Sequence, residues 1–557
     1  MTRARCSSSK AATTSISSAV EGWLARNVLE LGRELRLSYL PPLMVYVAAG
    51  ISGLTGIVGT FFVKEYLGLS AAFLAALGFW AGIPWALKMP VGHLVDLIWR
   101  WKALLVYFGA ALIAASLLIM VGLIEHTAAM RTVMPVAHWY VLAALLAPTG
   151  YMVQDAVADA MTVEAVPRVD AAGHPYGADE RKLMHTTMQT LGRVAIIGGS
   201  VLVASANVLL FQGADALPQA AKAALYADIY QLALVIPAVS LAGVMLASVL
   251  RRRQRARLRR QGFAEADIEH LLAVHGEQKT APNWWVLGGS LAFVIVTLAV
   301  GLSDLRFGQE LIFAGSLGVL LFLLWRLARE LEPAAREVLV ATALVLFVYR
   351  AVPGPGAGST WWEIDVLNFD QAFLAKLSLI ASGLTLAGMF IFRRYMAEKS
   401  IAQIIVMLTF AGTALGLPIV GMFYGLHHWT ESLTGGIVDA RFIALVDTAL
   451  ESPLGQIAMI PMLAWIANSA PPQLKATYFA VMASFTNLAL SAAQLGTEYL
   501  NRVFTVTREV KDHATGAILV RADYHEVGEL LVSATLIGLL LPLAAVGIAK
   551  LFRLRTA

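Results

Sequence analysis

Fourteen long apolar stretches recur along the chain, and they constrain its fold more than any other feature. A helix needs about 20 mostly apolar residues to cross the hydrocarbon core of a bilayer. Of the 557 residues, 58% are hydrophobic and only 14% are charged, which is not the composition of a soluble domain. We therefore predict an all-α polytopic membrane protein with about fourteen spans. They are expected near residues 39–63, 70–90, 103–124, 138–166, 184–211, 228–250, 284–303, 309–328, 336–352, 370–392, 401–424, 437–467, 476–500 and 527–549.

The order of these stretches predicts two bundles. Six spans precede a basic linker, two further spans follow it, and six more complete the chain. Two six-helix bundles that face each other across a cavity form the major facilitator fold. The two additional helices carry almost no charge within their spans, so we expect them at the periphery, facing lipid. The predicted segments are a cytoplasmic N-terminal segment (1–38), the first bundle (39–250), the basic linker (251–283), the two additional helices (284–328), the second bundle (329–550) and a cytoplasmic tail (551–557).

The distribution of basic residues predicts the orientation. If the N-terminus is cytoplasmic, most of the 42 Lys and Arg residues fall on the cytoplasmic side. Cytoplasmic loops of membrane proteins usually carry such an excess of Lys and Arg. We therefore expect a multi-pass protein of the cell (inner) membrane with both termini in the cytoplasm. The run "RRRQRARLRR" (251–260) is interpreted as a topology anchor that contacts anionic membrane lipids. A regulatory or nucleic-acid role for this run is the alternative, and we expect no nucleic-acid partner.

The stretch "GYMVQDAVADAMTVEAV" (150–166) places three carboxylates in an apolar span. Asp155 and Asp159 are four residues apart and share one helix face. Glu164 is rotated away from this face and lies near the cytoplasmic end. A charge at the bilayer centre costs at least about 2.5–3.5 kcal/mol, so such residues usually face a cavity and function there. The alternative is a carboxylate that one basic partner neutralises for packing alone.

The next span offers a basic partner for these carboxylates. In "HTTMQTLGRV", the residues His185, Gln189 and Arg193 lie along one helical stripe. Arg193 lies well inside the span, where it can pair with an Asp of the preceding helix or bind a carboxylate or planar heterocycle in a bidentate manner. His185 lies near the cytoplasmic end, and a polar residue close to a loop is its simpler interpretation.

The second half repeats this pattern in its fourth and fifth spans. Asp447 and Glu451 are again four residues apart, and Gln456 follows them. Since both halves carry polar groups in corresponding helices, a solute pathway between two repeats is favoured over scattered structural pairs. The fifth span of the second half places five polar residues along one stripe: Ser484, Asn487, Ser491, Gln494 and Glu498.

The loop after the second span, "GIPWALKMPVGHLVDLIWRWK", contains Lys88, Asp96 and Arg100. An Asp–Arg pair at this place can hold a cytoplasmic gate closed, so these three residues are predicted for the gate. For Asp96 a structural contact is favoured over contact with a solute.

Soluble-enzyme motifs are absent from the sequence. There is no phosphate-binding glycine loop followed by Lys and Ser or Thr, so ATP-driven transport has no support. The 11 His residues show no zinc-site spacing, and the only cysteine, Cys6, allows no intrachain disulfide. "PGPGAGSTWWEID" (353–365) is interpreted as an extracellular turn with interfacial tryptophans. We expect no enzyme activity, no cofactor and no metal.

Several stretches together resemble the folate–biopterin transporter family of the major facilitator superfamily. They are "GIPWALKMPVGHLVD", "QDAVADAMTVEAV", "VPGPGAG", "LNFDQAFLAKL" and "LVDTALESPLGQIAMIPMLAWIANSAPPQLKATYFAVMASFTNLALSAAQLG". This resemblance implies secondary active transport of folates or other pterins, coupled to protons, with Asp155, Asp159, Asp447 and Gln456 at the working positions. The glutamate tail of a folate would suit Arg193. The two additional helices and Lys475 depart from the family pattern.

The resulting hypothesis is alternating access, in which Asp155 or Asp159 takes up a proton and Arg193 then displaces it. The predicted pathway comprises Asp155, Asp159, Gln189, Arg193, Asp447, Glu451, Gln456, Asn487, Gln494 and Glu498. The predicted partners are a small solute, the coupling proton and membrane lipids. Two alternatives stay open: a major-facilitator permease for another solute, such as a muropeptide, and a non-transporting membrane protein for assembly or delivery.

Overall fold

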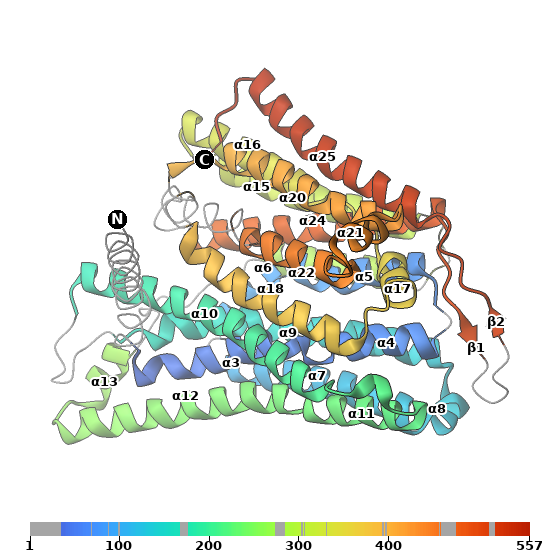
Figure 1. The fold of residues 1–557 in the computed structure, drawn as a ribbon. Coiled ribbons are helices and arrows are strands. Elements are labelled where there is room, and N and C mark those ends of the chain that lie inside the picture. The colour runs from blue at the N-terminus through green and yellow to red at the C-terminus, as the bar shows by residue number, and fades with distance from the viewer. Residues whose placement is uncertain are drawn as a thin grey trace, which may run out of the picture.

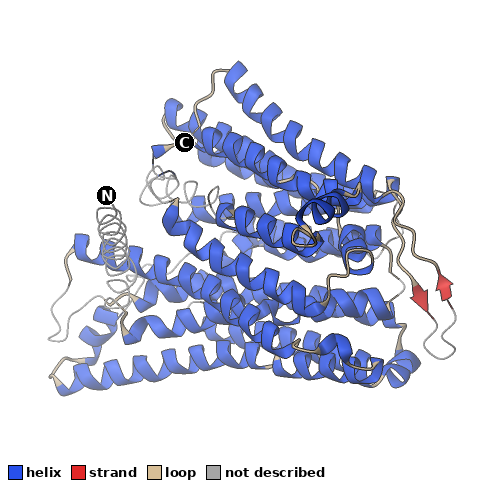
Figure 2. Cartoon of the chain, in the orientation of Figure 1, coloured by secondary structure: helices blue, strands red, loops and turns tan. Residues whose placement is uncertain are grey.

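The computed structural model describes residues 35–272 apart from 68, 87, 99–100 and 168–175, and residues 284–556 apart from a set of gaps. Helices form nearly all of this part of the chain, and its named strands form one short hairpin (Figure 2). The predicted all-α class is confirmed. The gaps in the second range are 302, 304, 306, 330, 393–394, 396–397, 456, 458–474 and 512–517.

The helices of the first half follow the six predicted apolar stretches. The first stretch is divided by a 3-10 turn, and the sixth is formed by two consecutive helices. The elements are η2 (Leu37–Tyr39), α3 (Leu40–Gly50), η3 (Ile51–Thr55), α4 (Gly56–Tyr66), α5 (Ala71–Ala86), α6 (Lys88–Leu97), α7 (Lys102–Glu125), α8 (Thr127–Val133), α9 (Val136–Ala165), α10 (Ala178–Leu210), η5 (Ala214–Ala216), α11 (Gln219–Leu232), α12 (Val235–Arg260) and α13 (Glu265–Leu272).

The additional pair and the second half follow in the same way. The elements are α14 (Trp284–Gly301), α15 (Gly308–Ala328), α16 (Pro333–Arg350), α17 (Ala357–Asp365), α18 (Gln371–Ile391), α20 (Ile401–Phe423), α21 (Leu426–Thr434), α22 (Ala440–Glu451), η6 (Ser452–Leu454), α24 (Lys475–Val503), β1 (Val510–Lys511), β2 (Ile518–Val520) and α25 (Val527–Leu551). The strands β1 and β2 pair antiparallel.

Every one of the fourteen predicted stretches contains described helix. Within the described residues, nine helical stretches are long and apolar enough to cross a membrane. The helix α5 is apolar but shorter. The count of fourteen spans therefore stays a prediction. The nine stretches are Leu37–Glu65, Lys102–Glu125, Val136–Ala165, Thr190–Leu210, Gln219–Arg260, Gly308–Arg326, Gln371–Met389, Ile401–Phe423 and Val527–Leu551.

The two halves meet mainly along two pairs of helices, with smaller contacts of α6 with α24, α4 with α18 and α5 with α17. The helix α5 packs along α24, and α10 packs along α18. Glycine makes the first of these contacts close, since a Cβ atom on Gly82 would lie 2.5 Å from the Ser491 hydroxyl oxygen. A larger residue at this position would force the helices apart, so the sequence sets the spacing of the two halves at this interface.

The additional helices α14 and α15 pack over the junction of α5 and α24. Val300 and Ile312 of the pair form one buried cluster with Phe79 and Ile83 of α5. The hydroxyl of Tyr499 on α24 donates a hydrogen bond to Glu310 of α15. The pair therefore contacts both halves, while several of its apolar side chains stay exposed: Leu291, Ile295, Val319, Phe322 and Trp325.

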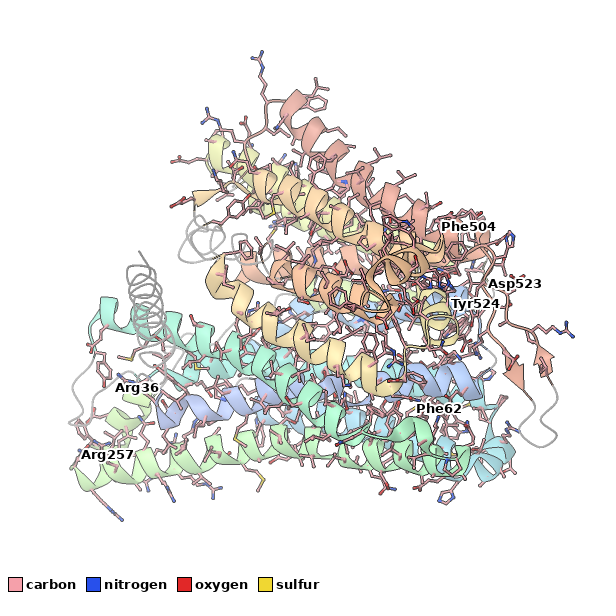
Figure 3. The ribbon with its side chains drawn as sticks, in the orientation of Figure 1. Arg36, Phe62, Arg257, Phe504, Asp523 and Tyr524 are labelled. Atoms are coloured by element: carbon pink, nitrogen blue, oxygen red, sulfur yellow. The ribbon has the colours of Figure 1, made fainter. Side chains whose placement is uncertain are left out.

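The helices run roughly side by side between two ends of the molecule (Figure 1). Arg36 and Arg257 lie at one end, and Phe504, Asp523 and Tyr524 lie at the other (Figure 3). The first is called the Arg-rich end and the second, which carries the β-hairpin, the hairpin end. By the excess of basic residues in cytoplasmic segments, the Arg-rich end is the predicted cytoplasmic end.

Candidate functional site: a charged cluster between helices

A lysine lies between the two acidic residues of the first half. The Nζ atom of Lys88 lies 2.5 Å from an Asp155 carboxylate oxygen and 2.8 Å from an Asp159 oxygen. Lys88 is the first residue of α6, and both aspartates lie on one face of α9, as their spacing predicts. The structure thus brings together Asp155 and Asp159 with Lys88, which the sequence analysis had assigned to the cytoplasmic gate.

The two carboxylates differ in their access to solvent. The Asp155 side chain is 17% exposed, whereas the Asp159 side chain is 51% exposed. The hydroxyl of Tyr46 on α3 donates a hydrogen bond of 2.8 Å to Asp159. Lys88 and Asp155 therefore form the covered part of the cluster, and Asp159 presents an accessible carboxylate. A Lys between two ionised Asp residues leaves one net negative charge at the cluster.

Glu164 has its own basic partners farther along α9. One of its oxygens lies 2.6 Å from Lys102 Nζ on α7 and 2.6 Å from an Arg251 nitrogen on α12. Three helices of the first half meet at this carboxylate. This agrees with the interpretation of Glu164 as a residue near the helix end rather than a member of the central cluster.

Arg193 lies on α10 with an exposed side chain. Its charge is within electrostatic range of Tyr46 and Asp155, although no ion pair joins it to Asp155 or Asp159 in the described part of the chain. Gln189 and His185 lie on the same helix, and their side chains fall outside the described residues. Arg193 therefore acts on Asp155 through its charge, without forming the predicted ion pair among the described residues.

The acidic pair of the second half is arranged differently. Asp447 on α22 is 7% exposed, and its Oδ1 atom has no hydrogen-bond partner among the described residues. Glu451 ends the same helix and is exposed. Gln456 lies outside the described residues.

The polar stripe of α24 faces α5 for part of its length. Asn487 lines a cavity of about 260 Å³ together with Gly82, Trp85 and Leu490. Gln494 lies beside Gly78, whose added Cβ atom would come within 2.8 Å of the amide oxygen.

The remaining members of the stripe are buried. The hydroxyl groups of Ser484 and Ser491 have no hydrogen-bond partner in the part of the chain that the structure describes. Glu498 is buried and pairs with Arg502 one turn later. Of the five polar side chains in this stripe, only those of Asn487 and Gln494 are accessible between the two halves.

The predicted cytoplasmic gate is only partly described. Asp96 lies in α6, but its side chain falls outside the described residues, as does Arg100 entirely. The predicted Asp96–Arg100 contact therefore stays a prediction.

A second set of charged residues, which the sequence analysis did not select, joins the two halves at the hairpin end. Lys64 Nζ lies 2.5 Å from an Asp365 oxygen of α17, and the Tyr524 hydroxyl donates to the same carboxylate. Arg508 is 4% exposed and donates to the backbone oxygens of Lys64, at 2.5 Å, and Leu69, at 2.7 Å. We call Lys64, Asp365, Arg508 and Tyr524 the outer clasp. More than 400 residues separate Lys64 from Tyr524 in the chain, so no local sequence pattern predicts this set of contacts.

The sequence analysis also missed Glu363, which lies on α17 inside the stretch interpreted as an extracellular turn. Ser359 donates a hydrogen bond of 3.4 Å to its carboxylate. Burial raises the pKa of Glu363 to about 7, and nearby Asp447 adds to this effect against the hydrogen bond from Ser359. A Glu directly after two adjacent tryptophans was the available signal in the sequence.

Comparison with known proteins gives the family. The chain matches the BT1 family over residues 49–546. The chain belongs to this family. A folate-biopterin transporter of Synechocystis sp. is 21% identical over 477 residues, which are 85% of this chain and 76% of that protein. The predicted resemblance to the folate–biopterin transporter family is thereby confirmed.

Solved transporters share the fold of this BT1-family protein. A POT family transporter in complex with 5-aminolevulinic acid aligns with a TM-score of 0.59 at 13% identity, covering 93% of this chain and 96% of that one. The nucleoside transporter NupG gives 0.51 at 12% identity, covering 92% and 99%. The chain therefore has the fold of these solved transporters. Its family and its apolar helices make it a multi-pass membrane transporter and not an enzyme, as predicted.

Proposed function

We propose that this BT1-family protein is a secondary active transporter that carries folate- or biopterin-like pterins by alternating access, coupled to protons. The observation that carries the proposal is the cluster of Lys88, Asp155 and Asp159, in which Asp159 presents an accessible carboxylate. The name of the Synechocystis relative supports the same class of solute.

The chemistry of a pterin suits this cluster. One edge of a pterin carries an amino group and a ring N–H side by side, so it can donate two parallel hydrogen bonds. A carboxylate accepts such a pair through its two oxygens. Asp159 is the carboxylate of this type that is accessible, while Asp155 holds Lys88 in place.

Arg193 supplies the complementary charge for a folate. It lies exposed on α10, within electrostatic range of the cluster. A guanidinium binds a carboxylate in a bidentate manner, so the glutamate tail of a folate would contact Arg193 while its ring contacts Asp159. Gln189, Asn487, Gln494, Glu498, Asp447, Glu451 and Gln456 complete the proposed pathway.

The outer clasp supports alternating access. Its contacts join the end of α4 and the α4–α5 connection of the first half to α17 and to Arg508, just before the hairpin, in the second half. With the Arg-rich end in the cytoplasm, as we propose for a protein of the inner membrane with both termini inside, these contacts close the outside. They must break when the transporter opens outward.

Uptake into proteoliposomes tests the proposal. Labelled folate and biopterin are supplied with an inward proton gradient and with the gradient collapsed. Accumulation that requires the gradient, and that Asp159→Asn reduces strongly, is the expected result. If neither solute is taken up by folded protein, the substrate assignment is wrong and another solute must be sought. If Asp155→Asn and Asp159→Asn both leave uptake unchanged, the role of the cluster is wrong.

A further inference from the structure

A cavity of about 260 Å³ lies between α5 of the first half and α24 of the second half. Gly82 and Trp85 line it from α5, and Asn487 and Leu490 line it from α24. Pockets that enclose a drug-sized ligand have volumes of roughly 300–1,000 Å³. The cavity is smaller, so it suits one planar ring system rather than a whole folate.

The cavity lies on the inner side of the α5–α24 junction. The additional helices α14 and α15 cover the other side, where they form a buried cluster with Phe79 and Ile83 of α5. Gly82 and Trp85 share a different face of α5, turned by roughly 100° from the face of Phe79 and Ile83. Leu490 is 45% exposed at the cavity wall. The cavity therefore opens toward the space between the halves and not toward the additional helices.

The charged cluster of the first half lies close to this cavity. Trp85 precedes Lys88 by three residues, so their Cα atoms lie within about 11 Å of each other. Lys88 forms ion pairs with Asp155 and Asp159 of α9. The helices that carry Trp85 and Lys88 both pack against α9, and α6 also packs against α24. A solute in the cavity is therefore within reach of the groups that the proposed function assigns to binding.

The cavity wall combines an aromatic surface with hydrogen-bonding groups of the opposite half. Trp85 supplies a large flat side chain, and the amide of Asn487 can both donate and accept hydrogen bonds. Gln494 lies two turns farther along the same stripe of α24 and is exposed. Ser491 lies between them, and its buried hydroxyl has no hydrogen-bond partner among the described residues. These polar groups favour a ligand with hydrogen-bonding edges over a lipid chain.

We propose that Trp85 and Asn487 form the ring-binding subsite of this transporter, in which the solute ring packs on the Trp85 indole and hydrogen-bonds to the Asn487 amide. This inference rests on the proposed function and names residues that select a pterin. The ionised carboxylate of Asp159 only accepts hydrogen bonds, so it recognises the amino and N–H groups of the ring. The amide of Asn487 also donates, so it recognises the ring carbonyl.

The subsite connects solute binding to the contact between the halves. Trp85 belongs to the first half and Asn487 to the second. A ligand shifts a conformational equilibrium only when it interacts differently with the two states. A ring that contacts both side chains holds α5 against α24, and these contacts are lost when the helices separate. A solute bound by the first-half cluster alone would not distinguish the two arrangements in this way.

Binding of biopterin and folate to the purified protein tests the subsite. Trp85→Leu removes the aromatic surface and should weaken binding of both solutes by about tenfold or more. Asn487→Leu should have a similar effect, because it removes the amide. Trp85→Phe keeps an aromatic ring and should bind within about threefold of the unmodified protein. The matched controls are Trp429→Leu on α21 and Gln212→Leu in the turn after α10, both exposed, and they should bind normally.

The fluorescence of bound biopterin tests the contact with Trp85 itself. Pterins are fluorescent, and an indole in van der Waals contact quenches them by electron transfer, whereas a phenyl ring does not. The emission of biopterin should fall on binding to the unmodified protein and should be retained on binding to Trp85→Phe. A purely structural role of Trp85 would not produce this difference. Equal quenching in the two proteins would overturn the proposed contact, even if both bind biopterin equally well.

The outcomes separate this inference from the proposed function. If the unmodified protein binds and transports a pterin while Trp85→Leu and Asn487→Leu bind it as tightly, the subsite is wrong and the proposed function stands. If the pterin binds and is quenched by Trp85 but is not accumulated with a proton gradient, the subsite stands and the proposed coupling is wrong. If the folded, unmodified protein binds neither biopterin nor folate, both are wrong.

Discussion

Lys64 and Asp365 lie 2.5 Å apart at the hairpin end, although they belong to opposite halves of the chain. Lys64 is close to the end of α4, and Asp365 is the last residue of α17. Their side chains are 13% and 28% exposed, so the pair is partly shielded from water. Such a pair is stronger than a fully exposed one, which contributes about 0–1 kcal/mol.

Breaking this pair should open the outer side. Lys64→Met is expected to increase labelling of a cysteine placed at Ser491 by an impermeant maleimide added from outside, in a Cys6→Ser background. Ser491 is 1% exposed in the closed arrangement, so labelling reports opening. Lys222→Met, which removes another lysine from the first turn of α11, should leave the labelling unchanged. The exchange Lys64→Asp with Asp365→Lys should restore low labelling, and failure of Lys64→Met to raise it would contradict the role of the clasp.

Arg508 should tolerate no conservative replacement. Its guanidinium donates to two backbone oxygens of the first half and lies 4.8 Å from the centre of the Trp361 ring. Lys has a single ammonium group and cannot reproduce the fork or the stacking. Arg508→Lys should leave a buried carbonyl unsatisfied and lower the free energy of unfolding by about 1–3 kcal/mol. Thermal unfolding in detergent measures this, with Arg521→Lys, at an exposed position directly after β2, as the control.

Substitutions of the two aspartates of α9 should have different effects, one mainly on solute binding and the other mainly on thermal stability. Asp159→Asn removes an accessible acceptor, so KM for a pterin should rise by about 10- to 100-fold, the equivalent of a hydrogen bond to a charged group of about 1.5–3 kcal/mol. Asp155→Asn removes the more buried partner of Lys88 and should lower Tm more than Asp159→Asn does. Equal effects of the two substitutions on both quantities would contradict the division of roles.

The sequence predicted that Asp155 and Asp159 share one helix face, but it did not predict the basic residue that forms ion pairs with them. Two residues four apart on a helix share a face for geometric reasons alone, so this part follows from local sequence. Arg193 was the expected partner because it lies on the next helix along the chain. Lys88 forms the contacts instead, 67 residues before Asp155. Which distant helix packs against α9 is a tertiary property, and periodicity does not encode it.

The stretch around Glu363 shows the same limit. Its Pro, Gly and Trp residues predicted a turn at a membrane boundary, and Gly356 indeed adopts a φ of +76°, which favours glycine. The helix that follows, α17, packs against α5 and α25, which lie far from it in the chain. An acidic residue directly after two adjacent tryptophans was the local sign in the sequence that this turn is not simply exposed.

Stability should depend on pH through Glu363. Burial raises its pKa from 4.5 to about 7 in the folded protein. A carboxyl group with a raised pKa favours the folded state at low pH, because the folded state then binds the proton more tightly than the unfolded state. This contribution is complete below about pH 4.5 and is lost as the pH rises to about 7. Tm should therefore fall between these values, and the loss has an upper limit of about 3 kcal/mol.

Glu363→Gln isolates this contribution, because the amide stays neutral at every pH. Tm of the variant should exceed that of the unmodified protein at pH 8, and the difference should disappear at pH 4.5. The control Glu431→Gln should follow the unmodified protein throughout, since its carboxylate is exposed. Parallel curves for Glu363→Gln and the unmodified protein would show that Glu363 carries no raised pKa in the folded state.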